Sequence, residues 1–302
     1  MASGGGTRAI VAALLANTGI AVTKFIAWLL TQSSSMLAES IHSLADASNQ
    51  VLLLVGGKRA TRDATPDHPF GYGRERYVYA FVVAIVLFSV GGLFALYEAW
   101  HKWSDPHAID AWHWVPVVVL VVAIVMEAFS FRTAIVESNH VRGRRGWVEF
   151  VRTAKEPELP VILLEDLGAL VGLFFALFGV GMTLLTHDGR WDAAGTAMIG
   201  LLLVAIAAVL AVEMKSLLLG GGATPEHVRA IEAALPGDGV ESVIHMKTLH
   251  LGPEELLVAA KVAVPASSTG EQIAQAIDAA EHRVRDAVPI ARVIYLEPDL
   301  RR

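Results

Sequence analysis

The sequence predicts an integral membrane protein, in which an all-α bundle of six transmembrane helices is followed by a small α+β domain. Of the 302 residues, 54% are hydrophobic and only 18% are charged, whereas soluble domains carry about 25% charged residues. The apolar residues are gathered in blocks of about 20, the length that spans the core of a bilayer. This composition excludes a soluble enzyme and a disordered chain. The absence of cysteine excludes thiol chemistry, and a net charge of −6 gives no reason to expect nucleic acid.

Six apolar stretches are the candidates for the transmembrane helices. They cover residues 9–30, 36–57, 77–99, 113–135, 159–185 and 193–219. The first is longer than the apolar region of a signal peptide, and no small-residue cleavage site follows it. We therefore expect it to be a first membrane span that stays in the protein.

Positive charge is concentrated in two of the connecting loops. The loop after the second stretch contains Lys58, Arg59, Arg62, Arg74 and Arg76, and the loop after the fourth contains Arg142, Arg144, Arg145, Arg152 and Lys155. The positive-inside rule places both loops in the cytoplasm, and with six spans both termini lie there too. Because no arginine-rich transit segment precedes the first span, we expect a bacterial plasma (inner) membrane.

The last 80 residues predict a separate cytoplasmic domain. Three glycines at 220–222 mark the boundary, so that residues 1–222 form the membrane domain and residues 223–302 form the second domain. Thr224 and Pro225 can begin a helix as its N-cap and first residue. Two strands (240–250 and 254–264), a helix (269–287) and a last strand (291–297) follow. This order predicts a two-layer α+β unit.

Polar residues inside the second stretch form the clearest functional signal. They are Ser35, Glu39, His42, Asp46 and Asn49, at spacings of four, three, four and three. Such spacings place all five on one helix face. Ionisable groups at bilayer depth are expensive and mark functional sites. The alternative is that the stripe only joins helices by hydrogen bonds, which serine or threonine would do at a lower desolvation cost.

His42 and Asp46 are spaced to reach one ion beside the helix. Imidazole nitrogen and carboxylate oxygen both bind Zn²⁺ at about 2.0–2.2 Å. Further ligands must come from a second helix, and the fifth stretch offers Glu165 and Asp166. Adjacent residues point about 100° apart on a helix, so one acid is expected to face the site and the other a neighbouring helix.

Other intramembrane polar residues are weaker candidates. Asn17 and Lys24 share a face of the first stretch, where Lys24 can offset an acid or extend to the interface. Glu127 and Ser130 of the fourth stretch can line a cavity. For all four, a role in helix packing or in lining a cavity is the stronger expectation. With Glu39 and Asn49, Asn17 and Lys24 are kept as possible supporting residues of the site.

Two segments of this chain resemble those of a known family. Residues 34–50 (SSMLAESIHSLADASNQ) resemble the second-helix signature of the cation diffusion facilitators, and residues 68–76 (HPFGYGRER) resemble the loop after that helix. The resemblance covers nearly the whole chain. It implies secondary-active efflux of divalent cations, most often Zn²⁺, in exchange for protons, by alternating access in a homodimer. It also implies a ferredoxin-like fold for the C-terminal domain, and His42 and Asp46 as metal ligands.

The fifth stretch departs from the usual pattern of that family. The pattern has a histidine four residues before the aspartate, and here Asp166 matches the aspartate while Ile162 replaces the histidine. Residues 164–166 (Leu-Glu-Asp) resemble a divergent branch that includes a mitochondrial zinc transporter of eukaryotes. In this reading Glu165 supplies the missing ligand. A site with one histidine and several carboxylates also accepts Mn²⁺, Fe²⁺ or Co²⁺.

Two other classes of function compete with transport. A membrane metalloenzyme is disfavoured, because the sequence has no HExxH motif and only one histidine at mid-membrane. A non-transporting metal sensor or scaffold, acting through the soluble domain, is the remaining alternative. We expect no enzyme activity and no cofactor. The expected substrates are the metal ion and protons, and the expected partners are the bilayer and a second copy of the chain.

Overall fold

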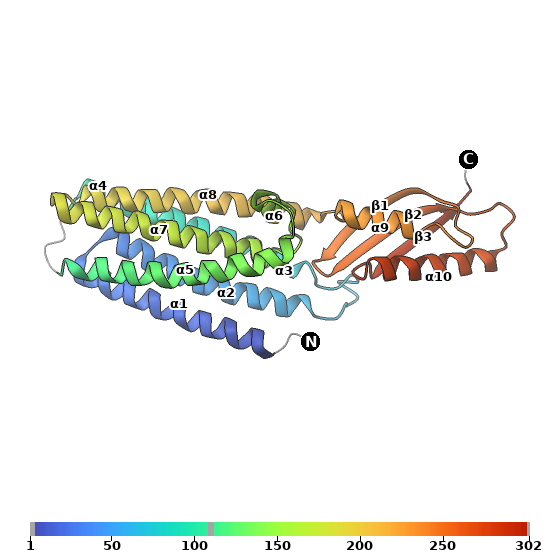
Figure 1. The fold of residues 1–302 in the computed structure, drawn as a ribbon, viewed down its shortest axis with the longest axis horizontal. Coiled ribbons are helices and arrows are strands. Elements are labelled where there is room, and N and C mark those ends of the chain that lie inside the picture. Colours follow the sequence, from blue (N-terminus) through green and yellow to red (C-terminus); the bar gives the residue numbers. More distant parts are fainter. Residues whose placement is uncertain (1–3, 108–111, 301–302) are drawn as a thin grey trace. The chain divides into compact units, whose positions relative to one another are not determined.

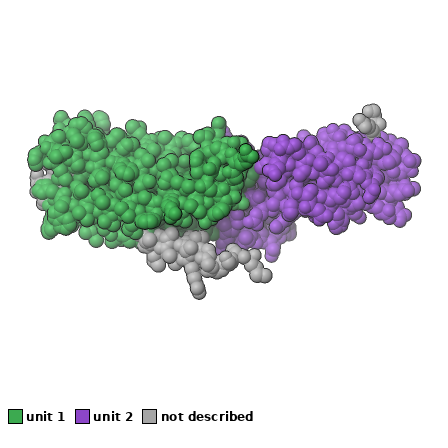
Figure 2. Space-filling view, in the orientation of Figure 1, with its two compact units in different colours: residues 1–56, 78–214 green, residues 57–77, 215–302 purple. Residues whose placement is uncertain are grey.

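The structure is a computed structural model that describes residues 4–107 and 112–300. The chain divides into two compact units, one made of residues 1–56 and 78–214 and the other of residues 57–77 and 215–302 (Figure 2). The first unit is a bundle of long helices that run side by side (Figure 1). The second contains a small sheet with two helices.

Each of the six apolar stretches lies in a long helical segment. The helices of this part are α1 (Gly4–Thr31), α2 (Ser34–Ala60), α3 (Glu75–Val86), the π-helix η1 (Leu87–Leu93), α4 (Phe94–Ser104), α5 (Trp114–Arg142), α6 (Trp147–Thr153), α7 (Glu158–Thr186) and α8 (Arg190–Gly220). Within the described residues, four stretches are long and apolar enough to cross a membrane. They are the continuous α3–η1–α4 helix, α5, α7 and the stretch that begins with α8. Among the long helices α2 is the least apolar, because it carries the polar stripe.

Helices α7 and α8 cross closely through paired glycines. A Cβ atom added to Gly195 of α8 would lie 3.1 Å from the Cα atom of Gly179, and one added to Gly179 would lie 2.8 Å from the carbonyl oxygen of Trp191. Small residues at a crossing allow the backbones of membrane helices to approach. The crossing joins the helix that carries Glu165 to α8.

The C-terminal part has the predicted order helix–strand–strand–helix–strand. Its elements are α9 (Pro225–Ala234), β1 (Ser242–Gly252), β2 (Glu255–Ala263), α10 (Gly270–Ala287) and β3 (Val293–Asp299). The strand β2 lies between β1, to which it is antiparallel, and β3, to which it is parallel. One face of β2, with Leu256, Val258 and Val262, packs with Ile231 of α9 and Val284 of α10. The alternation of side chains along a strand explains why these β2 residues share one core.

Candidate metal-transport site

The polar face of α2 is turned toward the interior of the bundle. The side chains of Glu39, His42 and Asn49 are 0% exposed, and that of Asp46 is 15% exposed. His42 Nδ1 lies 3.5 Å from Asp46 Oδ1, and neither atom makes a hydrogen bond. The polar stripe predicted from the residue spacing therefore faces the interior, and the His42 imidazole lies next to the Asp46 carboxylate.

The two acids of α7 point toward different helices. Asn49 of α2 donates its Nδ2 hydrogen to Glu165 Oε1 at 2.6 Å, and Glu165 is buried. Asp166 Oδ2 instead accepts from the Ser130 hydroxyl of α5 at 2.8 Å. The 100° step between adjacent helical residues explains this division. Glu165 is thus the acid that faces the polar stripe of α2.

A further acid of α5 belongs to the same region. The Asp46 carboxylate interacts electrostatically with Glu165, Asp166 and Glu127, and Glu127 also interacts with Lys24 and Glu39. From the sequence, Glu127 and Ser130 were assigned to packing or to the lining of a cavity. In the sequence, the only indication that Glu127 and Ser130 lie on the same side of α5, near the acids of α7, was their spacing of three residues.

Lys24 is the one buried cation beside these acids in the described residues. Its Nζ atom donates to Glu39 Oε2 at 2.9 Å and to the Ser43 hydroxyl at 2.8 Å. It therefore offsets an acid rather than extending to the interface. The other oxygen of Glu39 has no hydrogen bond and occupies the space that Gly172 leaves open, 2.9 Å from where a Cβ would be. Asn17 is half-buried on α1, and no hydrogen bond joins it to the cluster within the described residues.

Several buried polar atoms of the α2 face have no hydrogen-bond partner. They are both ring nitrogens of His42, Oδ1 of Asp46, Oε1 of Glu39 and Oδ1 of Asn49. Each such atom costs about 1–3 kcal/mol, and most proteins contain few of them. Nowhere in the described residues do three His, Asp or Glu side chains converge closely enough to hold a metal ion. For His42, Asp46, Glu165 and Asp166 to bind one ion, side chains of α2 and α7 must move together.

A second polar cluster lies at the N-terminal end of α2. Asp192 of α8 accepts hydrogen bonds from the backbone N–H groups of Ser34 (2.7 Å) and Ser35 (3.3 Å) and from the Ser33 hydroxyl (2.9 Å). The hydroxyl of Thr196 lies 3.0 Å from that of Ser34. A carboxylate at a helix N-terminus accepts hydrogen bonds from the free N–H groups there and interacts favourably with the positive end of the helix dipole. Ser35 therefore belongs to a cap on α2 and not, as its spacing predicts, to the polar stripe with His42 and Asp46.

Long apolar helices that are packed together and bury acids, a histidine and a lysine are typical of an integral membrane protein with a functional polar interior. Residues 10–219 match the cation efflux transmembrane domain. The chain therefore belongs to the cation efflux family, which confirms the resemblance to the cation diffusion facilitators. Members of this family are transporters, so the protein is not an enzyme.

Three known relatives of this chain have names that refer to zinc antiport or to metal tolerance. It is 30% identical over 242 residues to the proton-coupled zinc antiporter SLC30A9, mitochondrial, of Xenopus laevis, over 79% of this chain and 43% of that protein. It is 31% identical over 232 residues to the human protein of the same name, over 76% and 41%. Metal tolerance protein C4 of Arabidopsis thaliana is 26% identical over 252 residues, over 82% and 54%. The chain thus spans about half the length of these relatives or less, and its resemblance to the divergent branch is confirmed.

The expected bacterial plasma membrane is contradicted by these comparisons. The SLC30A9 relatives of frog and human are both named as mitochondrial. The prediction was wrong because it used the start of this chain, and a chain that covers 41–43% of such relatives carries no information on their leader segments. The assignment to a membrane stands, since it rests on the apolar helices and on the family match.

Proposed function

We propose that this protein exports divalent metal cations, chiefly Zn²⁺, across a membrane in exchange for protons. The observation that carries the proposal is the pair His42 and Asp46, in which both ring nitrogens and the Oδ1 atom are buried and have no hydrogen-bond partners. Such atoms are costly in an apolar bundle unless a ligand binds them. The printed activity of the relatives, proton-coupled zinc antiport, supports the same cargo.

We assign the ligand set to His42, Asp46 and Glu165, with Asp166 as an alternative or additional ligand. Glu165 is favoured because it already bonds to α2 through Asn49, whereas Asp166 bonds to α5 through Ser130. A bound metal ion would replace the hydrogen bond from Asn49 to Glu165 with a stronger contact between the ion and the Glu165 carboxylate. This donor set, with one imidazole and several carboxylates, suits Zn²⁺ and also accepts Mn²⁺, Fe²⁺ or Co²⁺.

Proton exchange follows from the chemistry of these ligands. Imidazole and carboxylate groups must be deprotonated to bind a metal, so protons and metal compete for the same atoms. We propose His42 as the proton carrier of the set, because an imidazole binds a metal ion or a proton through the same ring nitrogen. Glu39 is left outside the ligand set, because one of its oxygens already pairs with Lys24.

The wider architecture is part of the proposal. We infer that all six long helical segments cross the membrane, because α1 and α2 have 28 and 27 residues and about 20 residues are enough to span. We also infer a homodimer that works by alternating access, with a C-terminal domain of ferredoxin-like fold. The names of the relatives support a mitochondrial membrane as its location.

Metal flux into sealed proteoliposomes tests this function. Zn²⁺, Mn²⁺, Fe²⁺ and Co²⁺ would be compared with and without an imposed proton gradient, in wild type and in Asp46→Ala. The proposal expects Zn²⁺ flux that needs both the gradient and Asp46. Absence of flux for every metal, in protein shown to be folded, would contradict it and favour a sensor or scaffold.

A further inference from the structure

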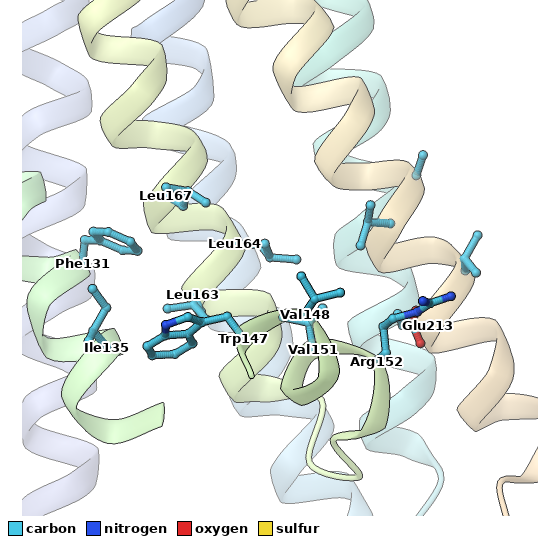
Figure 3. A pocket seen from close by; sticks show the side chains of 13 residues that line it. Phe131, Ile135, Trp147, Val148, Val151, Arg152, Leu163, Leu164, Leu167 and Glu213 are labelled. Atoms are coloured by element: carbon cyan, nitrogen blue, oxygen red, sulfur yellow. The ribbon is translucent and has the colours of Figure 1, made fainter. Parts of the chain in front are cut away.

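A recess opens between α5, α6, α7 and α8, and none of the proposed metal ligands lines it. Its volume is about 880 Å³, within the range of sites that bind small molecules. Phe131 of α5, Leu163 and Leu167 of α7, Val151 of α6 and Val209 of α8 contribute to its wall. Figure 3 shows these helices converging around it.

The lining of the recess is almost entirely hydrocarbon. Apart from Arg152, Glu213 and the indole of Trp147, every lining side chain is aliphatic or a phenyl ring. Val148 and Val212 are 73% and 64% exposed there. Such a surface excludes water and favours an apolar ligand. For a membrane protein, the apolar groups that surround such a surface are the acyl chains of lipids.

Charge is confined to one side of the recess. Arg152 and Glu213 lie next to each other there, away from Phe131 and Ile135 (Figure 3). Arg152 Nε and Glu213 Oε1 are 3.8 Å apart and the Arg152 side chain is 71% exposed. That distance is too long for a hydrogen bond, so the guanidinium keeps its donors available for a stronger acceptor.

The segment around Arg152 is strongly basic. Residues 142–155 contain the cationic Arg142, Arg144, Arg145, Arg152 and Lys155 and the acidic Glu149. The guanidinium of Arg145 is already hydrogen-bonded within its own loop, because it donates to the carbonyl oxygens of Val141 and Arg142. Arg144 is exposed, like Arg152. A basic rim beside an apolar recess matches the two ends of a lipid with an acidic headgroup.

We propose that this recess binds an anionic glycerophospholipid of the surrounding bilayer, with an acyl chain among α5, α7 and α8 and its phosphate on Arg152. The bound chain would contact Leu163, Leu164 and Leu167, which flank Glu165 and Asp166 in the sequence of α7. The lipid would therefore fix the turns of α7 that carry both acids. Binding itself does not depend on the transport proposal.

Quenching of tryptophan fluorescence by brominated lipids tests this site in the full chain. The protein would be placed in vesicles of phosphatidylcholine that contain brominated phosphatidylglycerol or, at equal fraction, brominated phosphatidylcholine. The contribution of Trp147 is the difference between wild type and Trp147→Phe. We expect brominated phosphatidylglycerol to quench this contribution about threefold more than brominated phosphatidylcholine. Arg152→Gln should remove the preference, whereas Arg190→Gln, at an exposed arginine outside the recess, should keep it.

A second pair of variants tests the cavity rather than the charge. Ala208 and Ala205 are both exposed on α8, and of the two only Ala208 lines the recess. Ala208→Phe should reduce the quenching of Trp147 by both lipids, and Ala205→Phe should leave it unchanged. Equal quenching by the two lipids in wild type would overturn the proposal, since it indicates ordinary contact with the bilayer. Absence of quenching would overturn it too, because the recess is then closed or covered by another protein surface.

Discussion

Helix α2 carries two buried polar clusters that differ in how completely they are bonded. At its N-terminal end, Asp192 accepts hydrogen bonds from both the backbone and the side chains of the serine segment 33–35. In its middle, His42 is fully buried and Asp46 is 15% exposed, yet both ring nitrogens of His42 and the buried Oδ1 atom of Asp46 have no hydrogen-bond partner. The same helix therefore holds one closed network and one open set of donors and acceptors.

The difference separates a structural cluster from a binding cluster. A fully bonded network gains stability from its hydrogen bonds and has no capacity left for a ligand. An incompletely bonded one loses about 1–3 kcal/mol for each unpaired group, and persists where a ligand can recover that loss. The cluster around Asp192, here called the outer cluster, thus fixes the start of α2. The cluster of His42 and Asp46, here called the inner cluster, is suited to bind an ion.

The largest effect is expected from removal of the imidazole. His42→Gln keeps a polar side chain of similar size but removes a metal ligand, so Zn²⁺ flux into proteoliposomes should fall by about 100-fold. Ser48→Ala is the matched control, because Ser48 lies on the exposed side of α2 and bonds only to the Leu44 carbonyl. Flux in His42→Gln equal to that of the control would place the ion elsewhere.

The outer cluster should respond in stability rather than in binding. Asp192→Asn removes a charge that accepts several hydrogen bonds at the start of α2, and should lower the free energy of unfolding by about 2 kcal/mol. Thermal unfolding of the purified protein measures this change. The fraction that stays folded should still bind Zn²⁺. A variant with unchanged stability would show that this network does not hold the helix.

The two acids of α7 should differ in their contribution to flux. Glu165→Gln should reduce Zn²⁺ flux about tenfold, because Glu165 faces α2 through Asn49. Asp166→Asn should have a smaller effect, since Asp166 is bonded to α5 through Ser130. Flux assays of the two variants, side by side at equal protein density, measure the ratio. The reverse order would make Asp166 the ligand.

The smallest effect concerns the C-terminal sheet. Lys261 of β2 contacts Glu297 and Asp299 of β3, and the hydrogen bond to Glu297, followed by that to Asp299, raises the pKa of Lys261 above 10.5. Because the folded pKa is raised, the contribution is present below pH 10.5 and is lost as the pH rises through the raised value. Lys261→Met should therefore lower the unfolding temperature slightly at neutral pH, and the difference should vanish in strong alkali. A difference that persists in alkali would mean that the lysine acts by packing.

Patterns of residues that are close in the sequence predicted much of the fold and the polar face of α2. The spacing of Glu39, His42 and Asn49 predicted one shared face, and the structure buries all three. The order of helices and strands after residue 224 also followed from caps and alternation. Both depend on residues that are close in the sequence, which a reading of periodicity captures.

What the sequence left open depends on contacts between distant segments. The rotation of α7, which turns Glu165 toward α2 and Asp166 toward α5, is set by packing against both neighbours. The role of Asp192 was missed because its partners, Ser33 and Ser34, are about 160 positions earlier in the chain. Ser35 fitted the metal stripe by spacing alone, and only the partner on α8 showed that it belongs to the cap.

Equilibrium binding of Zn²⁺ to the purified full chain tests the division most directly. Wild type, Asp46→Ala and Asp192→Asn would be compared by equilibrium dialysis, at a temperature where all three are folded. We expect Asp46→Ala to lose a bound Zn²⁺ that wild type and Asp192→Asn both retain. Retention of that ion by Asp46→Ala, or its loss from folded Asp192→Asn, would contradict the assignment of the open cluster to the metal and of the closed cluster to structure.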